Sequence, residues 1–517
     1  MRNTCVRLLA LLVLLVGAAG CATLPENPPR GPPSQALPPS AEGALAELES
    51  SLRPRLGEQG SAWLVLDSNE EALRWRLVLL DSARHSIDLQ YYFWWEDETG
   101  QLVMKHVIEA ADRGVRVRIL LDDLTTLLED HRKPKVRDWQ TAILNAHPNI
   151  ELRLFNAFRS RSLLGRGFDF LRRMDVMNQR MHNKMLVADN RAVITGGRNI
   201  GNEYFGFATE FNFRDIDVLG VGPVVRQTSA VFDRFWNSEW VVPVAALELD
   251  ADSSDVRAET PRILGSLEGT PVVERFPVSR ANWSDELEQL SKSAHVGPGR
   301  VLTDTLVAGE VRHRMPKAMH DLMASAKSEL LITNSYVIPD EQDIALFRDL
   351  QARGVRVKLL TNSLASQDVP AVNSHYKSWR KPLLQAGVEL YETRPDAAIG
   401  PLLADTPPVR AEFVGLHVKA IVVDRRTVFI GSMNLDPRSE ELNSEMGVVI
   451  DSEPLALQMV GIIERDMQPA NAWRVWLTER GALQWVAEGQ TLRRQPARGL
   501  WQRAQDLFFM LFPRSLY

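Results

Sequence analysis

One short pattern occurs twice in this chain, and it limits the fold more than any other feature. Each copy reads H-x-K, four residues, D, six residues and G-x-x-N, and the copies start 235 residues apart. The first copy holds His182, Lys184, Asp189, Gly196 and Asn199, and the second holds His417, Lys419, Asp424, Gly431 and Asn434. In a chain of 517 residues of average composition, one chance match is on the order of 1 in 10,000. Two matches therefore indicate an internal duplication.

The duplication extends to the segments around the pattern. Residues 111–123 (A-D-R-G-V-R-V-R-I-L-L-D-D) are similar to residues 352–364 (A-R-G-V-R-V-K-L-L-T-N-S-L), with Gly114 aligned on Gly354. In each copy an amphipathic helical stretch ends at Arg-Gly, a helix-stop signal, and a strand rich in Val, Ile and Leu follows. Strands that alternate with helices in this way are typical of βαβ units. We therefore predict an α/β body in two similar halves.

The segments outside the repeat give the expected domain boundaries. We expect a signal peptide at 1–20, a Pro-rich tether at 21–45, a first lobe at 46–245, an inter-lobe connection at 246–310, a second lobe at 311–485 and a basic amphipathic tail at 486–517. Seven prolines lie between residues 21 and 40, which excludes a helix or a central strand there. Such a segment would be a stiff tether, reaching up to roughly 60 Å if it were fully polyproline-like.

The N-terminus is typical of a secretory signal. Two arginines precede an apolar run at 8–16, which is too short to span a bilayer, and small residues lead up to Cys21. This arrangement resembles a bacterial lipobox, in which Cys21 would be lipidated and become the mature N-terminus. The alternative is an ordinary signal peptide with a chance cysteine. The lipobox interpretation places the protein in a bacterial cell envelope, anchored to the inner or outer membrane and facing the periplasm, and Ala22 weakly favours the outer membrane.

Composition excludes several classes of function. Hydrophobic residues make up 45% and charged residues 24% of the chain, as in an ordinary folded body. The net charge of −6 makes a general nucleic-acid partner unexpected. Cys5 and Cys21 are the only cysteines, so neither a disulfide framework nor a cysteine metal site is expected. The motif histidines have no second ligand at metal-like spacing, and an ammonium neighbour opposes a cation, so we expect no metal and no other cofactor.

The duplicated pattern suits chemistry at a phosphate diester. His and Lys at positions i and i+2 of a strand point to the same face, so each copy presents an imidazole beside an ammonium. A single H-x-K would ordinarily be a solvated pair on a surface strand, and the duplication argues against that. We expect the turns at Gly196-Gly197 and Gly431-Ser432 to pass close to a ligand, and Asn199 and Asn434 to add amide donors. One histidine could then attack phosphorus while the other protonates the leaving oxygen.

These residues resemble the signature of the phospholipase D superfamily, the HKD enzymes. The first copy departs from it at Gly197, where Ser is commoner, and we expect this change to matter little; Ser432 keeps the usual residue. The resemblance implies two α/β lobes related by pseudo-two-fold symmetry, each a mixed β-sheet flanked by helices. It also implies a ping-pong mechanism through a phosphohistidine, with His182 as the nucleophile and His417 as the acid and then the base. In that family Asp189 and Asp424 would be structural supports.

The resemblance also implies an orienting acid for each histidine, further along the chain. Glu445, 28 residues after His417, fits this role in the second half. In the first half we expect Asp215 to orient His182, with Asp217 as the alternative. The physical reason for such an acid is that it fixes the imidazole tautomer.

Longer segments resemble the cardiolipin synthase C type. These are R-M-H-N-K, G-G-R-N-I-G-N-E-Y-F, R-D-I-D-V and N-L-D-P-R-S-E-E-L-N-S-E-M-G. The resemblance implies transfer of a phosphatidyl unit between phospholipids at a membrane, with phosphatidylethanolamine and phosphatidylglycerol as substrates. The alternatives are a phospholipase D-type hydrolase or a nuclease of the same fold, or a non-catalytic lipid-binding lipoprotein. Transfer and hydrolysis differ in whether an alcohol or water reaches the phosphohistidine, which depends on pocket shape and dryness.

Two further segments combine arginines with apolar residues. Residues 158–180 hold six arginines among Phe and Leu, and they are either a solvated amphipathic loop or a lid that touches anionic headgroups. Residues 491–517 hold five arginines against one aspartate and include L-F-F-M-L-F-P. This tail either lies in a membrane interface or docks on the body as a helix.

Overall fold

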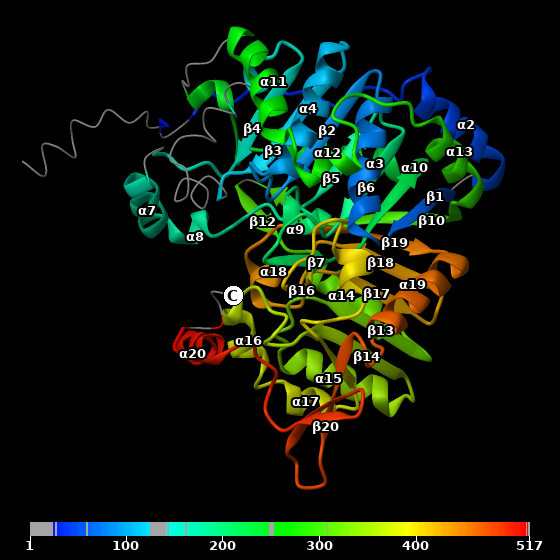
Figure 1. Ribbon diagram of the computed structural model, residues 1–517, viewed down its shortest axis with the longest axis vertical. Coiled ribbons are helices and arrows are strands. Elements are labelled where there is room, and N and C mark those ends of the chain that lie inside the picture. Colours follow the sequence, from blue (N-terminus) through cyan, green and yellow to red (C-terminus); the bar gives the residue numbers. More distant parts are fainter. Residues whose placement is uncertain are drawn as a thin grey trace, which may run out of the picture.

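The computed structural model describes residues 24–25, 28–57, 60–124, 141, 144–160, 163–247, 253–307, 309–512 and 514. The expected signal peptide, Cys5 and the proposed lipidation site Cys21 lie outside these residues. Two lobes lie one above the other, the first blue to green and the second green to red (Figure 1). The prediction of an α/β body in two similar halves is confirmed.

The first lobe contains a mixed sheet with the strand order β9-β4-β3-β2-β5-β6-β8-β1. Its strands are β1 (Gly60–Leu66), β2 (Ser86–Tyr91), β3 (Arg116–Asp122), β4 (Ile150–Phe155), β5 (Met185–Ala188), β6 (Ala192–Gly196), β8 (Asp217–Val221) and β9 (Val241–Pro243). Strands β2, β3 and β4 are parallel, and the other neighbours are antiparallel. The parallel part is the βαβ portion that the sequence repeat predicts.

The second lobe repeats this order as β20-β15-β14-β13-β17-β18-β19-β10, with the hairpin β21-β22 beyond β20. Its strands are β10 (His295–Thr303), β13 (Glu329–Asn334), β14 (Arg356–Asn362), β15 (Glu389–Thr393), β17 (Lys419–Val423), β18 (Thr427–Gly431), β19 (Met446–Asp451), β20 (Ala472–Leu477), β21 (Leu483–Ala487) and β22 (Gln490–Leu492). The parallel strands are again the three central ones, β13, β14 and β15. The two sheets are therefore copies of one topology.

Strand β10 joins the two sheets. Its first half pairs with β1 and its second half with β19, both antiparallel. This strand lies within the connection expected at 246–310, so the sheet of the second lobe begins before residue 311. A short hairpin follows it, formed by β11 (Thr305–Val307) and β12 (Glu310–Arg312). A second contact between the lobes is the parallel pair of β7 (Phe211–Arg214) and β16 (Phe413–Leu416).

Helices cover the sheets in corresponding places. The first lobe has α2 (Ala44–Leu56), α3 (Asn69–Ser82), α4 (Glu98–Asp112), α7 (Leu163–Arg172), α8 (Met174–Met177), α9 (Asn202–Phe205) and α10 (Pro223–Trp236). The connection adds α11 (Ser253–Leu267), α12 (Pro271–Arg275) and α13 (Ser284–Ser293). The second lobe has α14 (Met315–Ala324), α15 (Glu341–Ala352), α16 (Pro370–Tyr376), α17 (Arg380–Gln385), α18 (Pro437–Glu441), α19 (Glu453–Asp466) and α20 (Leu500–Phe509). The Arg-Gly helix stops are real, because Gly114 and Gly354 adopt positive φ angles of 89° and 79°.

The lobes share a hydrophobic core, and each also has one of its own. The shared core combines Trp63 and Trp236 of the first lobe with Val422 and Met459 of the second. Residues of β5 alternate between cores, since Met185 and Val187 face the shared one while Leu186 and Ala188 face that of the first lobe. This packing holds the two copies of the motif in one body.

The Pro-rich segment is bound to the first lobe along residues 28–40, which we call the proline strap. Ala36 donates its N–H to the Asp233 carboxylate at 2.9 Å, and the Ser34 carbonyl accepts from Arg118 at 3.1 Å. The Leu37 carbonyl accepts from Asn190 at 3.0 Å. The expected free tether of roughly 60 Å is therefore wrong for this part of the chain. A segment without secondary structure still carries carbonyls that surface side chains can bind.

The tail docks on the second lobe through polar contacts. Helix α20 buries Gln502 and Asp506, and Asp506 accepts from Asn373 and from Lys377, both at 2.7 Å. Its apolar side chains face outward instead. Within the described part of the chain, no helix combines the length and the apolar character needed to cross a bilayer.

Candidate active site

The two H-x-K pairs lie at the start of corresponding strands. His182 and Lys184 precede β5, and His417 precedes Lys419, the first residue of β17. All four side chains are buried. Each lysine donates to the carbonyl of its own histidine, Lys184 at 2.8 Å and Lys419 at 2.6 Å. Each ammonium therefore fixes the backbone that carries the neighbouring imidazole.

The two copies meet in one centre. The positive charges of Lys184 and Lys419 both lower the pKa of His182 and of His417, after the larger effect of burial. The pKa of each histidine is well below its usual value, so both imidazoles are neutral at pH 7. The structure therefore places the two histidines and the two lysines close together.

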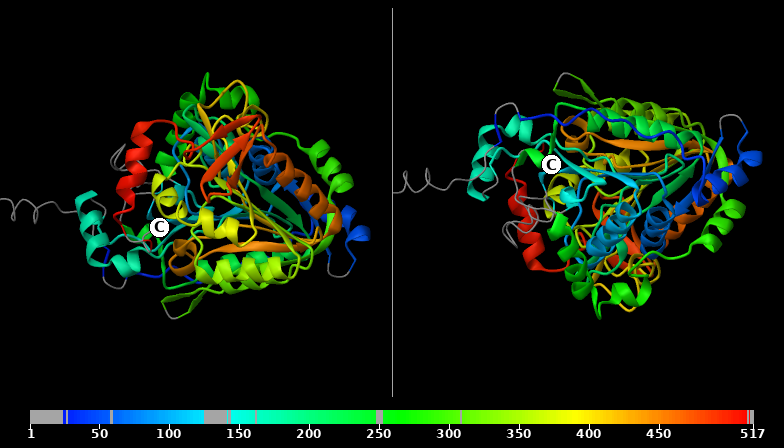
Figure 2. Two further views of the ribbon diagram at one scale, coloured as in Figure 1. Left: turned by 90° about the horizontal axis from the view of Figure 1, so that it is seen from below. Right: turned by 90° about the horizontal axis from the view of Figure 1, so that it is seen from above.

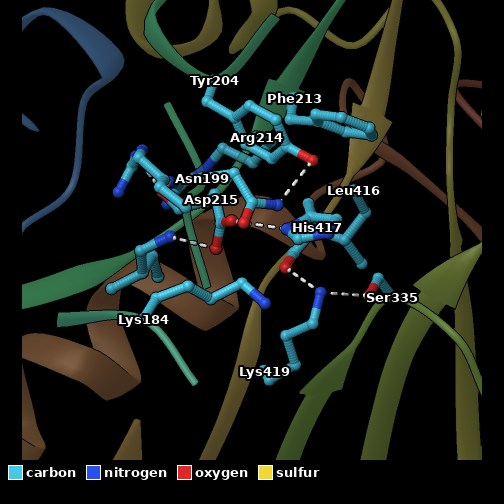
Figure 3. Close-up of polar contacts among 12 residues, drawn as sticks. Lys184, Asn199, Tyr204, Phe213, Arg214, Asp215, Ser335, Leu416, His417 and Lys419 are labelled. Atoms are coloured by element: carbon cyan, nitrogen blue, oxygen red, sulfur yellow. Dashed lines mark hydrogen bonds and ion pairs between the residues drawn. The ribbon is translucent and has the colours of Figure 1, made fainter. Parts of the chain in front are cut away.

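The carboxylates pair with the histidines across the two lobes. His182 Nδ1 lies 2.9 Å from Glu445 of the second lobe, and His417 Nδ1 lies 2.7 Å from Asp215 of the first (Figure 3). The expected pairing within each copy is therefore wrong. A neutral imidazole that donates from Nδ1 leaves a lone pair on Nε2, which is the atom available for chemistry.

Main-chain contacts between the lobes explain the exchange. The N–H of His417 donates to the Arg214 carbonyl at 2.8 Å, and the N–H of His182 donates to the Ser444 carbonyl at 2.9 Å. In each case the carbonyl belongs to the residue just before the acid. Strand pairing between β7 and β16 and the isolated bridge between Met181 and Ser444 thus align each acid with the opposite histidine.

Asp215, and not the alternative Asp217, occupies the position that corresponds to Glu445. Asp215 lies just before β8, as Glu445 lies just before β19. Asp217 instead forms an ion pair with Arg76 at 2.8 Å and lies 3.3 Å from Arg198. Its carboxylate is therefore used in a buried structural cluster.

The departure at Gly197 has a geometric cause. A Cβ atom at Gly197 would lie 2.6 Å from Asp215 Oδ1, so the carboxylate occupies the space of a serine side chain. In the second copy, Ser432 is present and donates its hydroxyl to Glu445. The copy with glycine at this position therefore has the shorter acid, Asp215, and the copy with serine has the longer acid, Glu445. This geometry does not support the expectation that the change from Ser to Gly matters little.

The motif glycines are needed for packing between strands. A Cβ at Gly196 would lie 2.3 Å from Asp217 Oδ1, and one at Gly431 would lie 2.5 Å from the Met446 carbonyl. We expected the backbone at these glycines to pass close to a ligand. In the structure it passes close to the neighbouring strands β8 and β19 instead. Contacts this short would force the neighbouring strand to move.

The motif asparagines bind side chains that border the histidines. Asn199 accepts from the Phe93 N–H and donates to the Tyr204 hydroxyl, both at 3.0 Å (Figure 3). Asn434 accepts from the Ser335 hydroxyl at 2.9 Å. Their expected role as amide donors to a substrate stays a prediction, while their role in positioning these neighbours is visible.

Asp189 and Asp424 lie at the far ends of β5 and β17, about 17 Å along the strand from the lysines. Each adopts a left-handed backbone conformation, with φ of 54° and 51°. Asp189 accepts from the N–H groups of residues 84–86, and Asp424 from those of residues 327–329. They support the chain as the resemblance implies, so they do not belong among the reacting groups.

Three tyrosines that were not among the expected site residues border the histidines. Tyr92 packs edge-on against His182, with ring centroids 5.1 Å apart. Tyr204 and Tyr336 pack edge-on against His417 at 5.3 and 6.4 Å. Burial raises the pKa of Tyr92 to about 12 and that of the other two well above 10, so all three hydroxyls stay protonated. Tyr92 lies one residue after β2, and Tyr336 lies two residues after β13.

Two residues outside the expected set of site residues hold the segments before the histidines. Asp122, at the end of β3, accepts from the Met181 N–H at 2.9 Å. Asn362, at the corresponding end of β14, accepts from the Leu416 N–H at 2.9 Å and donates to its carbonyl at 2.7 Å. The aligned strand ends, L-D-D and T-N-S, were the available signal.

Burial and charge shift the other ionisable groups of the centre. Burial raises the pKa of Glu445 to about 7, although Lys184 and hydrogen bonds from Ser432 and Ser439 oppose the shift. Burial lowers the pKa of Lys419 to about 8, while Asp215 and Glu445 act to raise it.

Among the described residues, no group of three or more His, Cys, Asp or Glu side chains is arranged to hold a metal ion. The donors and neutral imidazoles can thus bind and attack a phosphate ester.

Comparison with known proteins gives a consistent family. A family model described as "Cardiolipin synthase, PLD-like domain" matches residues 77–236 and 319–467. Cardiolipin synthase C of Escherichia coli (strain K12) is 35% identical over 468 residues, which cover 87% of this chain and 94% of that protein. Cardiolipin synthase 1 of Bacillus anthracis is 26% identical over 395 residues, or 75% of this chain and 63% of that protein.

A solved structure supports the fold. Phosphatidylserine synthase from Haemophilus influenzae Rd KW20 aligns with a TM-score of 0.56 at 14% identity. The alignment covers 90% of this chain and 100% of that one. At this identity the likeness concerns the arrangement of the two lobes and not the substrate.

Proposed function

This chain belongs to the phospholipase D-like family of cardiolipin synthases, and on that premise we propose that it is a phosphatidyltransferase that makes cardiolipin through a phosphohistidine. The observation that carries the proposal is the crossed pairing of His182 with Glu445 and of His417 with Asp215. It provides two neutral imidazoles in one centre, each with its Nε2 atom available. Neither lobe has a complete pair alone, so the chemistry requires both.

In the first step His182 is the nucleophile. Its Nε2 lone pair forms a bond to phosphorus of the donor phospholipid, and the bond from phosphorus to the headgroup oxygen breaks. The negative charge of the bound phosphate diester favours uptake of a proton from solvent by the neutral His417. His417 then gives its Nε2 proton to the departing oxygen, which leaves as an alcohol. Glu445 stabilises the positive charge that develops on His182.

In the second step the roles of His417 reverse. Neutral His417 takes the proton of an acceptor hydroxyl, whose oxygen attacks phosphorus and breaks the bond to His182 Nε2. The enzyme returns to its starting protonation state, and the acceptor has gained the phosphatidyl unit. Lys184 and Lys419 supply positive charge for the non-bridging phosphate oxygens, consistent with their effect on both histidines.

The substrates proposed from the family are phosphatidylglycerol and phosphatidylethanolamine. The name of the Escherichia coli relative, with 94% of its length covered, supports cardiolipin as the product. We further propose that a lipid on Cys21 anchors the protein to a membrane of the bacterial cell envelope, facing the periplasm. The proline strap then brings the anchored end onto the first lobe.

Lipid products test the transfer. Vesicles of phosphatidylethanolamine and phosphatidylglycerol are incubated with the enzyme, and the lipids are analysed by mass spectrometry. We expect cardiolipin with release of ethanolamine or glycerol. Phosphatidic acid as the dominant product would mean that water is the acceptor, and the protein would then be a hydrolase.

A further inference from the structure

Helix α20 is amphipathic, but it buries its polar side against the second lobe and exposes its apolar side. Its polar residues Gln502 and Asp506 are buried, at 5% and 3% exposure. Six of the apolar residues between 500 and 512 are 38–86% exposed, namely Leu500, Trp501, Leu507, Phe508, Leu511 and Phe512. A helix that used its apolar side for the body would bury that side. Here polar contacts attach the helix, and a bulky apolar side is left facing outward.

Helices α7 and α8 of the first lobe show the same feature. Phe168 and Leu171 on α7 are 67% and 75% exposed, and Met174 and Val176 on α8 are 44% and 40% exposed. These residues lie within the arginine-rich segment 158–180, which precedes His182 in the chain. Single exposed apolar residues are ordinary, but groups of large ones mark an interaction surface.

The two groups lie along the same edge of the molecule. Helices α7, α8 and α20 project together from one side in Figure 1, and both turned views in Figure 2 keep them on that side. Helix α19 lies at the opposite side in Figure 1. We define the apolar residues of α7, α8 and α20 as the apolar edge.

Each half of the apolar edge is linked to one histidine through a short series of contacts. Helix α8 ends at Met177, and Asn156 and Asp122 hold the few residues between it and His182. On the other side, Gln502 of α20 donates to the Leu364 carbonyl, in the loop that leads to Asp368. Asp368 accepts from the Tyr336 hydroxyl at 2.7 Å, and the Tyr336 ring packs against His417. The edge is thus built onto both half-sites.

Charge around the edge favours an anionic surface as the occupant. Arg172 is exposed next to Leu171 on α7, and Arg493 and Arg494 are exposed in the segment that leads to α20. A symmetric contact with a second copy would bring the arginines of both copies into one interface, where their like charges would repel. Aromatic and apolar side chains flanked by arginines are instead the composition of surfaces that lie in the headgroup region of a bilayer.

Leu24, four residues before the proline strap, contacts the first lobe near the same edge. The Leu24 N–H donates to the Arg159 carbonyl at 2.7 Å, where the segment toward α7 begins. Leu24 is three residues from Cys21, so the proposed lipid attachment lies within roughly 11 Å of this contact. A lipid at that position and the apolar edge would therefore reach the same bilayer.

We propose that the apolar edge is the membrane-docking surface, and that α7–α8 and α20 insert their apolar side chains on either side of the catalytic centre. Docking would place the centre against the headgroup layer, so that both lipid substrates enter without leaving the bilayer. The proposal rests on the proposed function for the identity of its substrates. Binding itself can be measured without turnover.

Hydrogen exchange of the full chain tests the surface directly. The protein is compared in dodecyl maltoside, on vesicles of phosphatidylethanolamine and phosphatidylglycerol, and on phosphatidylcholine vesicles. We expect slower exchange in residues 163–177 and 500–512 on the anionic vesicles, and unchanged exchange in α19. Equal protection of α19, or unchanged exchange at the edge, would overturn the proposal. Protection that rises with protein concentration in detergent would instead identify a second copy as the occupant.

Paired substitutions then separate docking from chemistry. The test variants are Phe168→Ser with Leu171→Ser, and Trp501→Ser with Leu511→Ser; the matched control is the exposed Leu457→Ser on α19, which is 48% exposed. We expect each test pair to lower turnover on vesicles by about tenfold, through weaker partitioning. Turnover of a dispersed short-chain phospholipid should stay within about twofold of the parent chain.

The outcomes distinguish this proposal from the proposed function. Equal loss on vesicles and on dispersed lipid would mean that the edge supports the fold or the centre, and the docking proposal would fail. If the protein shows the expected exchange pattern on vesicles but makes no cardiolipin, the docking proposal stands and the proposed activity is wrong. An unchanged rate on vesicles for both test pairs would overturn docking while leaving the transferase intact.

Discussion

The two half-sites of the centre share a backbone plan and differ in how each carboxylate is held. Glu445 accepts hydroxyl hydrogen bonds from Ser432 and from Ser439, the latter at 2.9 Å. Asp215 accepts from the Ile216 N–H at 2.8 Å, and the place of a serine is taken by Gly197. The longer acid therefore has side-chain support, while the shorter acid fills the space that such support would need.

This difference teaches that a duplicated site can give its copies unequal tasks without changing the fold. The pKa of Glu445 is raised to about 7 by burial, so its charge depends on the state of its partner His182. A carboxylate of that kind suits a histidine that gains positive charge when it bonds to phosphorus. In the proposed mechanism His417, with Asp215, shuttles a proton in both steps and needs a fixed tautomer.

The largest effect should come from removing either histidine. We expect His182→Ala and His417→Ala each to lower kcat about 10⁴-fold or more, because nucleophile and acid act in the same step. Purified variants are assayed for cardiolipin formation. If either variant kept more than a tenth of the parental rate, the two half-sites could not form one centre.

The next largest effect should follow from neutralising the acids. Asp215→Asn and Glu445→Gln keep the size of each side chain but favour the wrong imidazole tautomer, and we expect kcat to fall about 10²- to 10⁴-fold with little change in KM. The exposed Asp349→Asn serves as a control.

The crossed pairing adds a second readout to these variants. A phosphohistidine at His182 should form more slowly in Glu445→Gln than in Asp215→Asn when rapid-quench labelling is used. The reverse order would assign the nucleophile to His417 instead.

Sequence reasoning predicted the lobes and the histidines and lysines that the structure brings together, because these depend on local pattern. The H-x-K spacing on a strand determines that His182 and Lys184 share a face, whatever the rest of the chain does. The helix stops at Gly114 and Gly354 follow from the same local rules. These features repeat in both halves, so each copy supports the interpretation of the other.

The pairing of acids could not be predicted in that way. Which histidine Glu445 meets depends on how the lobes associate, through β7 with β16 and the bridge at Ser444. No periodicity within one lobe encodes that contact. The reversed burial of α20 is similar, because the sequence shows an amphipathic helix but not which side the second lobe binds.

A smaller effect should follow from giving the first half-site the serine of the second. Gly197→Ser would place a Cβ 2.6 Å from Asp215 Oδ1. We expect kcat to fall about 10- to 100-fold and stability to fall by about 1–3 kcal/mol, as in other overpacked sites. The control Gly461→Ser has open space around its Cβ and should match the parent chain.

The converse change sharpens the comparison. Ser432→Gly removes one of two hydroxyl donors to Glu445 and creates no clash, so we expect a loss of about 1 kcal/mol and a smaller drop in kcat. Equal effects of Gly197→Ser and Ser432→Gly would show that the two carboxylates are not held differently.

The last expected effect is on stability and not on turnover: the melting temperature should change with pH through the titration of Glu445. Its pKa is raised from 4.5 to about 7 in the folded state. Between those values the folded protein holds a proton that the unfolded chain releases, so stability falls as pH rises through this window, by at most about 3 kcal/mol. Burial lowers the pKa of His182, which acts in the opposite direction below pH 6.5. The difference in Tm between the parent chain and Glu445→Gln removes that contribution and should decrease from pH 5 to pH 8. A difference that increases with pH would mean an ion pair with His182 and a lowered pKa of Glu445.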